Sequence, residues 1–222
     1  MMYRIEVPAK LWAACGAAVS TEDSRPILQG VQVERRETTH GTACATNGHA
    51  LVAGRWALEN DGTRELVFPD GEIIVPFVKL SAIGIGAKAM DSALVVLTSS
   101  DERGDGKAIT WHVSALVKAR YSHAMETTGR TVAVREIEGP FPNWRQVVPT
   151  GDPIPSATFG FDPDVLAQAC DVLGKCTLTL YGDARGMIAR PTQTDGFQAF
   201  ALAMPLRVAG DHESGIPGWL SC

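Results

Sequence analysis

The sequence predicts an α+β protein built from antiparallel sheets, and two observations lead to this class. Short extended runs bounded by glycine, proline and Asn-Gly turns dominate the 222 residues, and no alternation of strands with long helices indicates a parallel sheet. In addition, a strand followed by a helix and then by further strands recurs, with onsets near residues 3, 72 and 157. The chain is therefore predicted to contain about three strand-helix-strands units.

The first unit opens with a strand over 3–7, which Pro8 ends, and a short helix over 10–20 follows. This helix places Leu11, Cys15 and Ala18 near one face, as expected for a helix with a buried side. The rest of the unit is predicted to be sheet, in extended runs over 27–37, 41–58 and 64–68.

The second and third units repeat this order. In the second, a strand over 72–76 precedes a helix over 77–90, which two internal glycines weaken. In the third, a strand over 157–161 leads to Asp162 as N-cap and Pro163 at the first helical position, the best helix signal in the chain. Further strands are predicted over 93–100, 108–114, 131–137, 177–182, 186–192 and 197–208.

A proline-rich segment over 139–155 joins the second unit to the third. It contains five prolines together with Phe141, Trp144 and Val147. Large apolar side chains would be poorly solvated in a free linker, so this segment is predicted to pack against both neighbouring domains.

Composition and charge exclude several classes of protein. No apolar run reaches the roughly 18 residues of a membrane span, and Arg4, Glu6 and Lys10 interrupt the segment where a signal peptide needs an apolar core. We therefore expect a cytoplasmic protein that has no membrane partner. The five cysteines match no disulfide framework and predict reduced thiols. A net charge of −5 argues against a surface that binds nucleic acid throughout, but it does not exclude DNA that is encircled.

The sequence contains no catalytic motif. It lacks a G-x-S-x-G nucleophile elbow and an H-E-x-x-H helix, and GDGKAIT over 104–110 lacks the residues of a phosphate loop. Cys44, His49, Cys170 and Cys176 could in principle hold zinc, although a cysteine inside a strand is more typical of a core. We therefore expect a protein without enzymatic activity, cofactor or metal.

Three segments taken together resemble one family, the bacterial DNA polymerase III beta subunit, or sliding clamp. RPILQG over 25–30 and CATNGHALVAG over 44–54 are similar to the R-x-x-L-x-G strand and the A-T-D-G-H-R-L turn of the family. FPNWRQVVP over 141–149 is similar to its F-P-D-Y-R-x-V-x-P linker, and FALAMPLRV over 200–208 to its V-V-M-P-M-R-L ending. Their common order and spacing carry the resemblance.

The resemblance implies a shortened homologue with the DNA-clamp fold. Residues 1–150 resemble the middle domain of the family and 151–208 resemble the second half of its last domain, followed by a flexible tail over 209–222. Two such chains would not close a ring as two bacterial clamp chains do, whereas four chains with three helices each would supply twelve inner helices. The sheet edges of an isolated half-domain also favour an oligomer.

The function that the resemblance implies is that of a polymerase processivity factor. Its oligomer would encircle duplex DNA without reading sequence and would bind DNA polymerase and other clamp-motif proteins through a hydrophobic pocket, with a clamp loader as a further partner. The alternative is a non-encircling adaptor or decoy that only binds clamp-interaction motifs, which the acidic charge and the missing half-domains favour. A third hypothesis places Trp219 and Leu220 of the tail in the pocket, in cis or in a neighbouring chain.

The resemblance also assigns residues to two sites. The partner pocket would be lined by Leu28, Thr46, Gly48, His49, Leu51, Pro142, Val147, Leu202, Met204, Pro205, Leu206 and Arg207. The DNA-facing residues would be Lys10, Arg25, Lys79, Lys88 and Lys175. Asn47, Ala50 and Gln146 stand where the family has charged residues, so a less charged pocket is expected. Without the resemblance, apolar residues on strands are more often core than pocket.

One segment, over 112–135, is longer than the corresponding connection in the family. It adds the basic residues Lys118, Arg120, His123 and Arg130. We expect either a basic loop that faces DNA or a variable surface loop.

Overall fold

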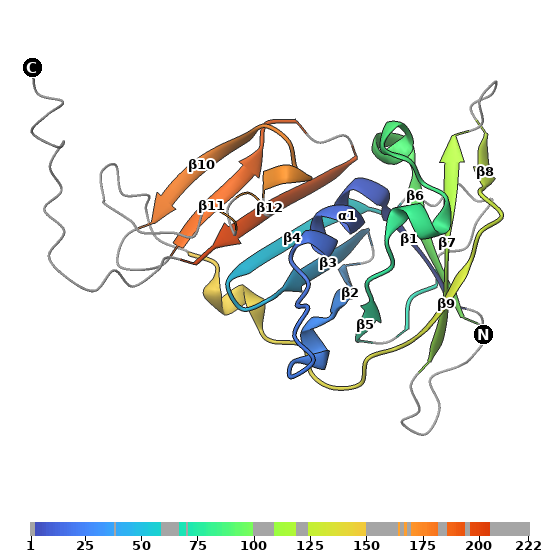
Figure 1. Ribbon diagram of the computed structural model, residues 1–222, viewed down its shortest axis with the longest axis horizontal. Coiled ribbons are helices and arrows are strands. Elements are labelled where there is room, and N and C mark those ends of the chain that lie inside the picture. The colour runs from blue at the N-terminus through green and yellow to red at the C-terminus, as the bar shows by residue number, and fades with distance from the viewer. Residues whose placement is uncertain are drawn as a thin grey trace, which may run out of the picture.

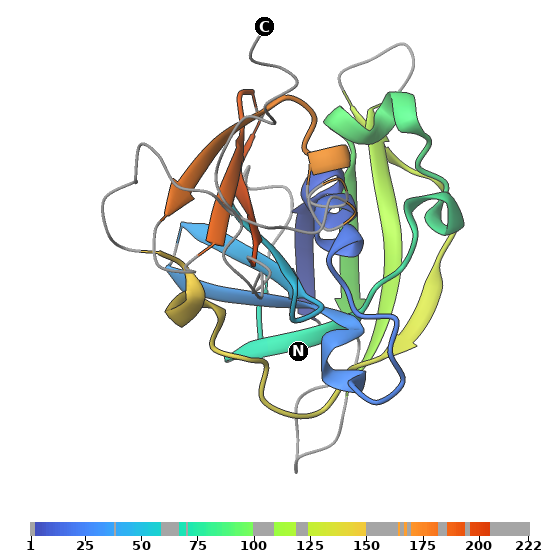
Figure 2. The same cartoon turned by 60° about the vertical axis from the view of Figure 1, so that its left-hand side comes forward.

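The computed structural model describes residues 3–37, 39–58, 67–69, 71–99, 109–118, 124–149, 164, 167, 170–181, 186–193 and 196–204. Within these ranges the chain forms two antiparallel sheets, and the helix α1 (Ala9–Ala17) lies between them (Figure 1, Figure 2). The predicted α+β class is therefore confirmed.

The larger sheet has seven strands in the order β10-β11-β12-β4-β3-β2-β5. The third predicted unit meets the first where β12 pairs antiparallel with β4. In this pairing Phe197 lies opposite Trp56 at one end, and Ala203 lies opposite Ala50 at the other. The strands of the third unit therefore continue the sheet of the first unit. Their bounds are β2 Gly30–Glu37, β3 His40–Thr46, β4 Ala50–Ala57, β5 Glu72–Pro76, β10 Cys176–Tyr181, β11 Gly186–Pro191 and β12 Phe197–Ala203.

The smaller sheet has the order β1-β6-β7-β8, with β9 also paired to β7. The first two predicted units exchange their first strands between the two sheets: β1 pairs with β6 of the second unit, and β5 pairs with β2 of the first. This exchange joins the two units into one body. The bounds are β1 Tyr3–Pro8, β6 Leu94–Ser99, β7 Thr110–Lys118, β8 Met125–Thr127 and β9 Val132–Arg135.

Helix α1 forms the centre of the core between the sheets. Leu11 and Trp12 are fully buried, and the indole N–H of Trp12 donates a 2.9 Å hydrogen bond to the backbone oxygen of Val78. The rings of Trp12 and Phe77 stack with their centroids 6.0 Å apart, and a Cβ at Gly16 would come within 2.0 Å of the Phe77 ring. The predicted helix is confirmed, and glycine at position 16 makes the close approach of Phe77 feasible.

The helix predicted over 77–90 is wrong. Two short 3-10 helices take its place, η2 (Leu80–Ile83) and η3 (Ala87–Ser92). Gly84 ends η2 in the left-handed region, with a φ of 83°, and Gly86 is extended, with a φ of −91° and a ψ of 164°. Two glycines so close together lower helix propensity enough for a left-handed cap to end the first helix.

The segment over 112–135 is mostly strand rather than loop where it is described. Strand β7 continues to Lys118, and β8 returns antiparallel beside it, with Lys118 opposite Met125. Lys118 and Arg130 are exposed. Arg120 and His123 lie outside the described residues.

The third predicted helix is described at only a few positions, among which Asp164 and Cys170 are helical. The strand predicted over 157–161, the cap residues Asp162 and Pro163, and the tail over 209–222 lie outside the described residues. Among the helices that the structure describes, none has the length and apolar character needed to cross a membrane.

Candidate functional site

The site lies on the face of the larger sheet that points away from α1. Side chains alternate along β4, so Val52 and Trp56 join the core around α1, whereas Leu51 and Ala53 join a second apolar cluster on the opposite face. On the neighbouring strand, Leu202 belongs to this second cluster. The pairing of β12 with β4 therefore builds one apolar floor from two distant parts of the chain.

The linker predicted over 139–155 packs on this floor in its described part. It contains the 3-10 helix η4 (Trp144–Val147), and Phe141 and Trp144 are both buried. The indole N–H of Trp144 donates a 2.9 Å hydrogen bond to the side-chain oxygen of Gln32 on β2, and its ring lies 6.3 Å from the ring of Phe200 on β12. The prediction that the linker packs against both neighbouring parts of the chain is confirmed for these residues.

The turn between β3 and β4 is held by its own side chains. The Thr46 hydroxyl donates to the backbone oxygen of Ala50 at 2.7 Å, and the Asn47 side-chain oxygen accepts from the N–H groups of His49 and Ala50 at 2.9 and 2.8 Å. Gly48 between them has a φ of 91°, a value that suits glycine. Asn47 thus serves as the turn residue, which a short polar side chain does well.

These elements enclose a cavity of about 200 Å³, here called the apolar cavity. It is lined by Leu28, Thr46, Gly48, His49, Ala50, Leu51, Pro142, Asn143, Trp144, Val147, Leu202 and Met204. Nine of the twelve residues assigned to the pocket from the sequence are brought together here. The other three, Pro205, Leu206 and Arg207, lie outside the described residues.

The base of the apolar cavity is buried and its mouth is exposed. Leu28, which ends the 3-10 helix η1 (Pro26–Leu28), lies at the base with Leu51 and Leu202, whereas Val147 is 45% and Met204 37% exposed. The backbone N–H of Met204 donates to the oxygen of His49 at 3.0 Å, which fixes the end of β12 beside the turn. The cavity therefore offers an apolar base and an apolar rim to an entering side chain.

Sequence reasoning missed Ala50, Asn143 and Trp144 as lining residues. The signal for Trp144 was present, because a tryptophan in a proline-rich linker was already predicted to be packed. Ala50 and Asn143 carry no pattern of their own and line the cavity through their neighbours in the chain.

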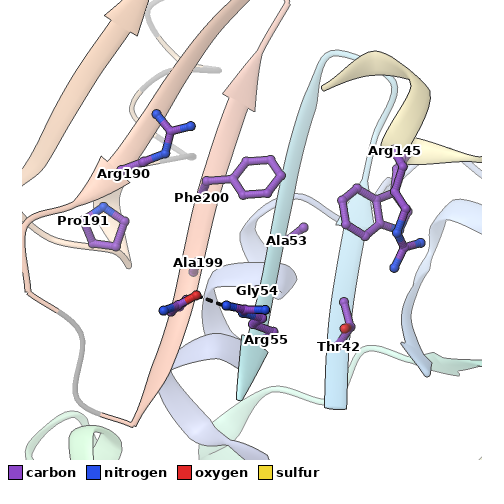
Figure 3. Close-up of a pocket in the computed structure, with 11 residues that line it drawn as sticks. Thr42, Ala53, Gly54, Arg55, Arg145, Arg190, Pro191, Ala199 and Phe200 are labelled. Atoms are coloured by element: carbon purple, nitrogen blue, oxygen red, sulfur yellow. Dashed lines mark hydrogen bonds between the residues drawn. The ribbon is translucent and has the colours of Figure 1, made fainter. Parts of the chain in front are cut away.

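A second and larger cavity, of about 470 Å³, shares Trp144 with the first. Figure 3 shows this larger cavity. Its floor includes Ala53, Ala199 and Phe200, and three arginines surround that floor. We call it the arginine groove and define it by Ala53, Arg55, Trp144, Arg145, Arg190, Ala199 and Phe200. Sequence reasoning missed this groove entirely, because the arginines come from three separate segments.

One of the residues assigned to DNA contact, Arg25, lies apart from Lys10 and η3. Lys10 on α1 forms a 2.9 Å ion pair with Asp91 in η3, and Lys79, Lys88 and Lys175 are exposed. Arg25 lies elsewhere, beside the Asn47–Gly48 turn, where its guanidinium lies 3.4 Å from the Asn47 backbone oxygen. Arg25 therefore neighbours the apolar cavity instead of standing on a helix.

The zinc alternative is wrong for the residues that the structure describes. Cys44 belongs to the apolar cluster under the linker, whereas Cys170 and Cys176 pack against the core around α1. No group of three or more histidine, cysteine, aspartate or glutamate side chains in the described ranges could hold a metal ion. The four described cysteines are free thiols, and burial raises the pKa of Cys15 and Cys44 above the ordinary value.

The sequence matches no protein-family model and no curated protein, but its structure is similar to solved bacterial clamps. The DNA polymerase III beta chain of Streptococcus pneumoniae gives a TM-score of 0.63 at 14% sequence identity, covering 93% of this chain and 65% of that one. The beta sliding clamp of C. crescentus gives 0.59 at 17%, covering 93% and 66%. The sliding clamp of Bacillus subtilis gives 0.59 at 17%, covering 93% and 64%.

These comparisons agree with the arrangement of the elements. The chain spans 65% of the length of the Streptococcus pneumoniae clamp, and the match covers 93% of this chain. At 14–17% identity, the likeness concerns the path of the backbone. The chain therefore has the fold of the bacterial DNA polymerase III beta sliding clamps.

Proposed function

We propose that the protein is a non-enzymatic sliding clamp that encircles duplex DNA as an oligomer and binds replication proteins through the apolar cavity. The observation that carries this proposal is the convergence of four segments on that cavity: Leu28, the turn over 46–51, the linker over 142–147 and the end of β12. The clamp fold of the similar structures supports the same function.

The apolar cavity suits one large apolar anchor of a partner's linear motif. Leu28, Leu51 and Leu202 provide the base that such a side chain would contact, and Val147 and Met204 lose water when it enters. Burying a leucine or aromatic side chain contributes about 1.5–3 kcal/mol, and methionine adapts its shape to different anchors. DNA polymerase and other proteins with clamp-binding motifs are the proposed partners.

Contact with DNA is proposed for Lys10, Lys79, Lys88 and Lys175, through loose phosphate contacts that read no sequence. Arg25 joins them in this proposal only if the turn beside the apolar cavity also approaches DNA. The proposed ring is a tetramer of three-helix chains, and a clamp loader would open it. Each chain is proposed to consist of a domain over 1–150 and a half-domain over 151–208.

A second candidate is an adaptor or decoy that binds clamp motifs without encircling DNA. One observation favours it: the ammonium group of Lys10 is paired with Asp91, which lowers the charge available to phosphates in a chain whose net charge is −5. The apolar cavity would then be the whole of the functional site.

The two candidates are distinguished by mass in solution, measured by light scattering, and by retention on nicked circular compared with linear duplex DNA. A closed oligomer that stays on circles and slides off linear ends supports the clamp. A monomer or open dimer that is retained on neither DNA, yet binds a clamp-motif peptide, supports the adaptor.

The role of the apolar cavity is tested by Met204→Ala. Removing the thioether side chain from the mouth is expected to weaken binding of a clamp-motif peptide by about 5- to 10-fold, measured by fluorescence anisotropy. Leu178→Ala is the matched control, because Leu178 is 48% exposed on β10 and lines neither cavity. Equal losses in both variants would contradict a specific role for the cavity.

A further inference from the structure

The arginine groove continues the apolar cavity along β4 and β12. Leu51 and Leu202 line the cavity, and the next residues on the same face of these strands, Ala53 and Phe200, line the groove. Trp144 lies in both linings and therefore forms the boundary between them. A ligand that extends from the cavity along the strands therefore passes this indole to reach the groove.

The groove has an apolar floor and a cationic rim (Figure 3). Arg190 on β11 lies on one side of the floor, Arg145 of the linker on the other, and Arg55 at one end. No aspartate or glutamate is among the described residues that line it. In an acidic chain, this local excess of positive charge selects for an anionic ligand.

Two of the three guanidinium groups are held in place. The side chain of Arg145 pairs with that of Glu34, and its guanidinium carbon lies 4.1 Å from the centroid of the Trp144 ring. The Nε of Arg55 donates a 2.9 Å hydrogen bond to the Gln198 side-chain oxygen, a neutral partner that does not offset the charge of Arg55. Holding a guanidinium in advance lowers the entropy lost when it binds a carboxylate.

Arg190 is exposed and forms no hydrogen bond or ion pair with another residue in the described ranges. Its planar donor set matches a carboxylate through two parallel hydrogen bonds. Of the three arginines, it therefore has the fewest donors occupied by described residues.

The spacing along β4 sets the distance between the two parts of a ligand. Leu51 and Arg55 are four residues apart on one strand, which is about 13 Å at the usual rise of about 3.3 Å per residue. An extended peptide has the same rise. An anchor in the cavity would therefore place a side chain about three to five residues away beside the arginines.

We propose that the arginine groove binds an acidic stretch of the same partner peptide whose apolar anchor enters the apolar cavity, three to five residues from that anchor. This inference rests on the proposed function of the cavity. The apolar floor and its continuity with the cavity favour a peptide over a DNA phosphate, because a peptide presents carboxylates together with aliphatic chain.

The test uses three labelled synthetic peptides and the full chain. One carries a Leu-Phe anchor flanked by serines; the other two replace the serines three to five residues from the anchor with aspartates, either N-terminal or C-terminal to it. One of the two acidic peptides, and not both, is expected to bind about 10-fold tighter than the serine peptide at low salt. In about 0.3 M salt the difference should fall below about 3-fold.

Arg190→Gln is expected to remove most of the gain of the acidic peptide while leaving the affinity for the serine peptide unchanged. Arg135→Gln is the matched control, because Arg135 is 75% exposed on β9 in the other sheet. Circular dichroism and urea unfolding are the check on the fold, and both exposed substitutions are expected to leave it intact.

Each outcome has a separate meaning. If the three peptides bind equally and Arg190→Gln changes nothing, the groove has no such role, although the function of the cavity stands. If no peptide binds, the proposed function fails and this inference fails with it. If a short DNA duplex displaces the acidic peptide with the same dependence on Arg190, the groove binds phosphate and the peptide proposal is wrong.

Discussion

Trp144 fixes the linker to the sheet at two points, the side chain of Gln32 and the ring of Phe200. Trp144→Ala removes both contacts and is expected to lower the free energy of unfolding by about 3–5 kcal/mol. Trp144→Phe keeps a ring but leaves the buried oxygen of Gln32 without its indole donor, at a cost of about 1–3 kcal/mol. Urea unfolding measures both values. A Trp144→Phe variant as stable as the natural chain would show that the hydrogen bond to Gln32 contributes nothing, and equal losses in both variants would show that the ring packing contributes nothing.

Two buried thiols make stability depend on pH. Burial raises the pKa of both Cys15 and Cys44, and the nearby Cys15 thiol adds to the effect on Cys44. In the unfolded chain these thiols ionise near their ordinary value of 9.0, so above that pH the unfolded state loses protons that the folded state keeps. Below about pH 8 these two thiols should not change the free energy of unfolding, because they keep their protons in both the folded and the unfolded state. Above about pH 9 it should fall, by up to about 1.4 kcal/mol per pH unit for each thiol.

Urea unfolding near pH 7.5 and near pH 10 checks this dependence, with the Cys15→Ala/Cys44→Ala double variant as control. The variant is less stable at both pH values because it loses packing, but it should lose less between them than the natural chain. Identical declines would assign the dependence on pH to other groups.

At the scale of elements, Gly84 decides how the segment after β5 is built. Its φ of 83° strains any residue with a Cβ, and that Cβ would lie 3.0 Å from the Cβ of Thr128, whose hydroxyl donates to the Ile83 oxygen. Gly84→Ala is expected to cost about 1–2 kcal/mol in urea unfolding. At Gly86, which is extended, a Cβ would meet no atom within 4 Å, so Gly86→Ala should be nearly neutral. The reverse order would contradict this account.

Strands were predictable from the sequence where turn residues bound an extended run of apolar and β-branched residues. The extended run over 41–58 shows this, since it forms β3 and β4 around the Asn47–Gly48 turn. The helix over 77–90 was predicted from its apolar content. Its glycines were expected only to weaken the helix, whereas Gly84 ends the short helix η2. The hairpin between β7 and β8 was missed because β8 has only three residues, two of them exposed, and therefore carries little apolar pattern.

The apolar cavity was predicted by resemblance, whereas the arginine groove could not be. The groove exists because β12 pairs with β4, which brings Arg55 and Gln198 together across 143 positions of sequence. No pattern within a short stretch of sequence indicates a strand pairing between residues so far apart in the chain. Reasoning from periodicity alone would also have left Leu51 and Leu202 as ordinary core residues.

At the scale of the whole molecule, β10 is an outer strand of the larger sheet and pairs only with β11 among the strands described. If this edge joins chains in the proposed oligomer, Leu178→Glu should lower the mass measured by light scattering, because a charge would oppose edge pairing. Its unfolding free energy should change little, since the Leu178 side chain is about half exposed.

Val147→Glu is the control for this prediction. The Val147 side chain is 45% exposed, so the substitution should leave the mass unchanged, but it should prevent peptide binding. An unchanged mass for Leu178→Glu would place the contact elsewhere.

The strand exchange between the two sheets has a consequence for synthesis on the ribosome. Strand β1 (Tyr3–Pro8) finds its neighbour only when β6 (Leu94–Ser99) has left the exit tunnel. At about 5–20 residues per second, the opening strand waits roughly 5 to 20 seconds for it. During that interval an alternating strand with an open edge is exposed, so the nascent chain has a stage at which a chaperone would be needed most.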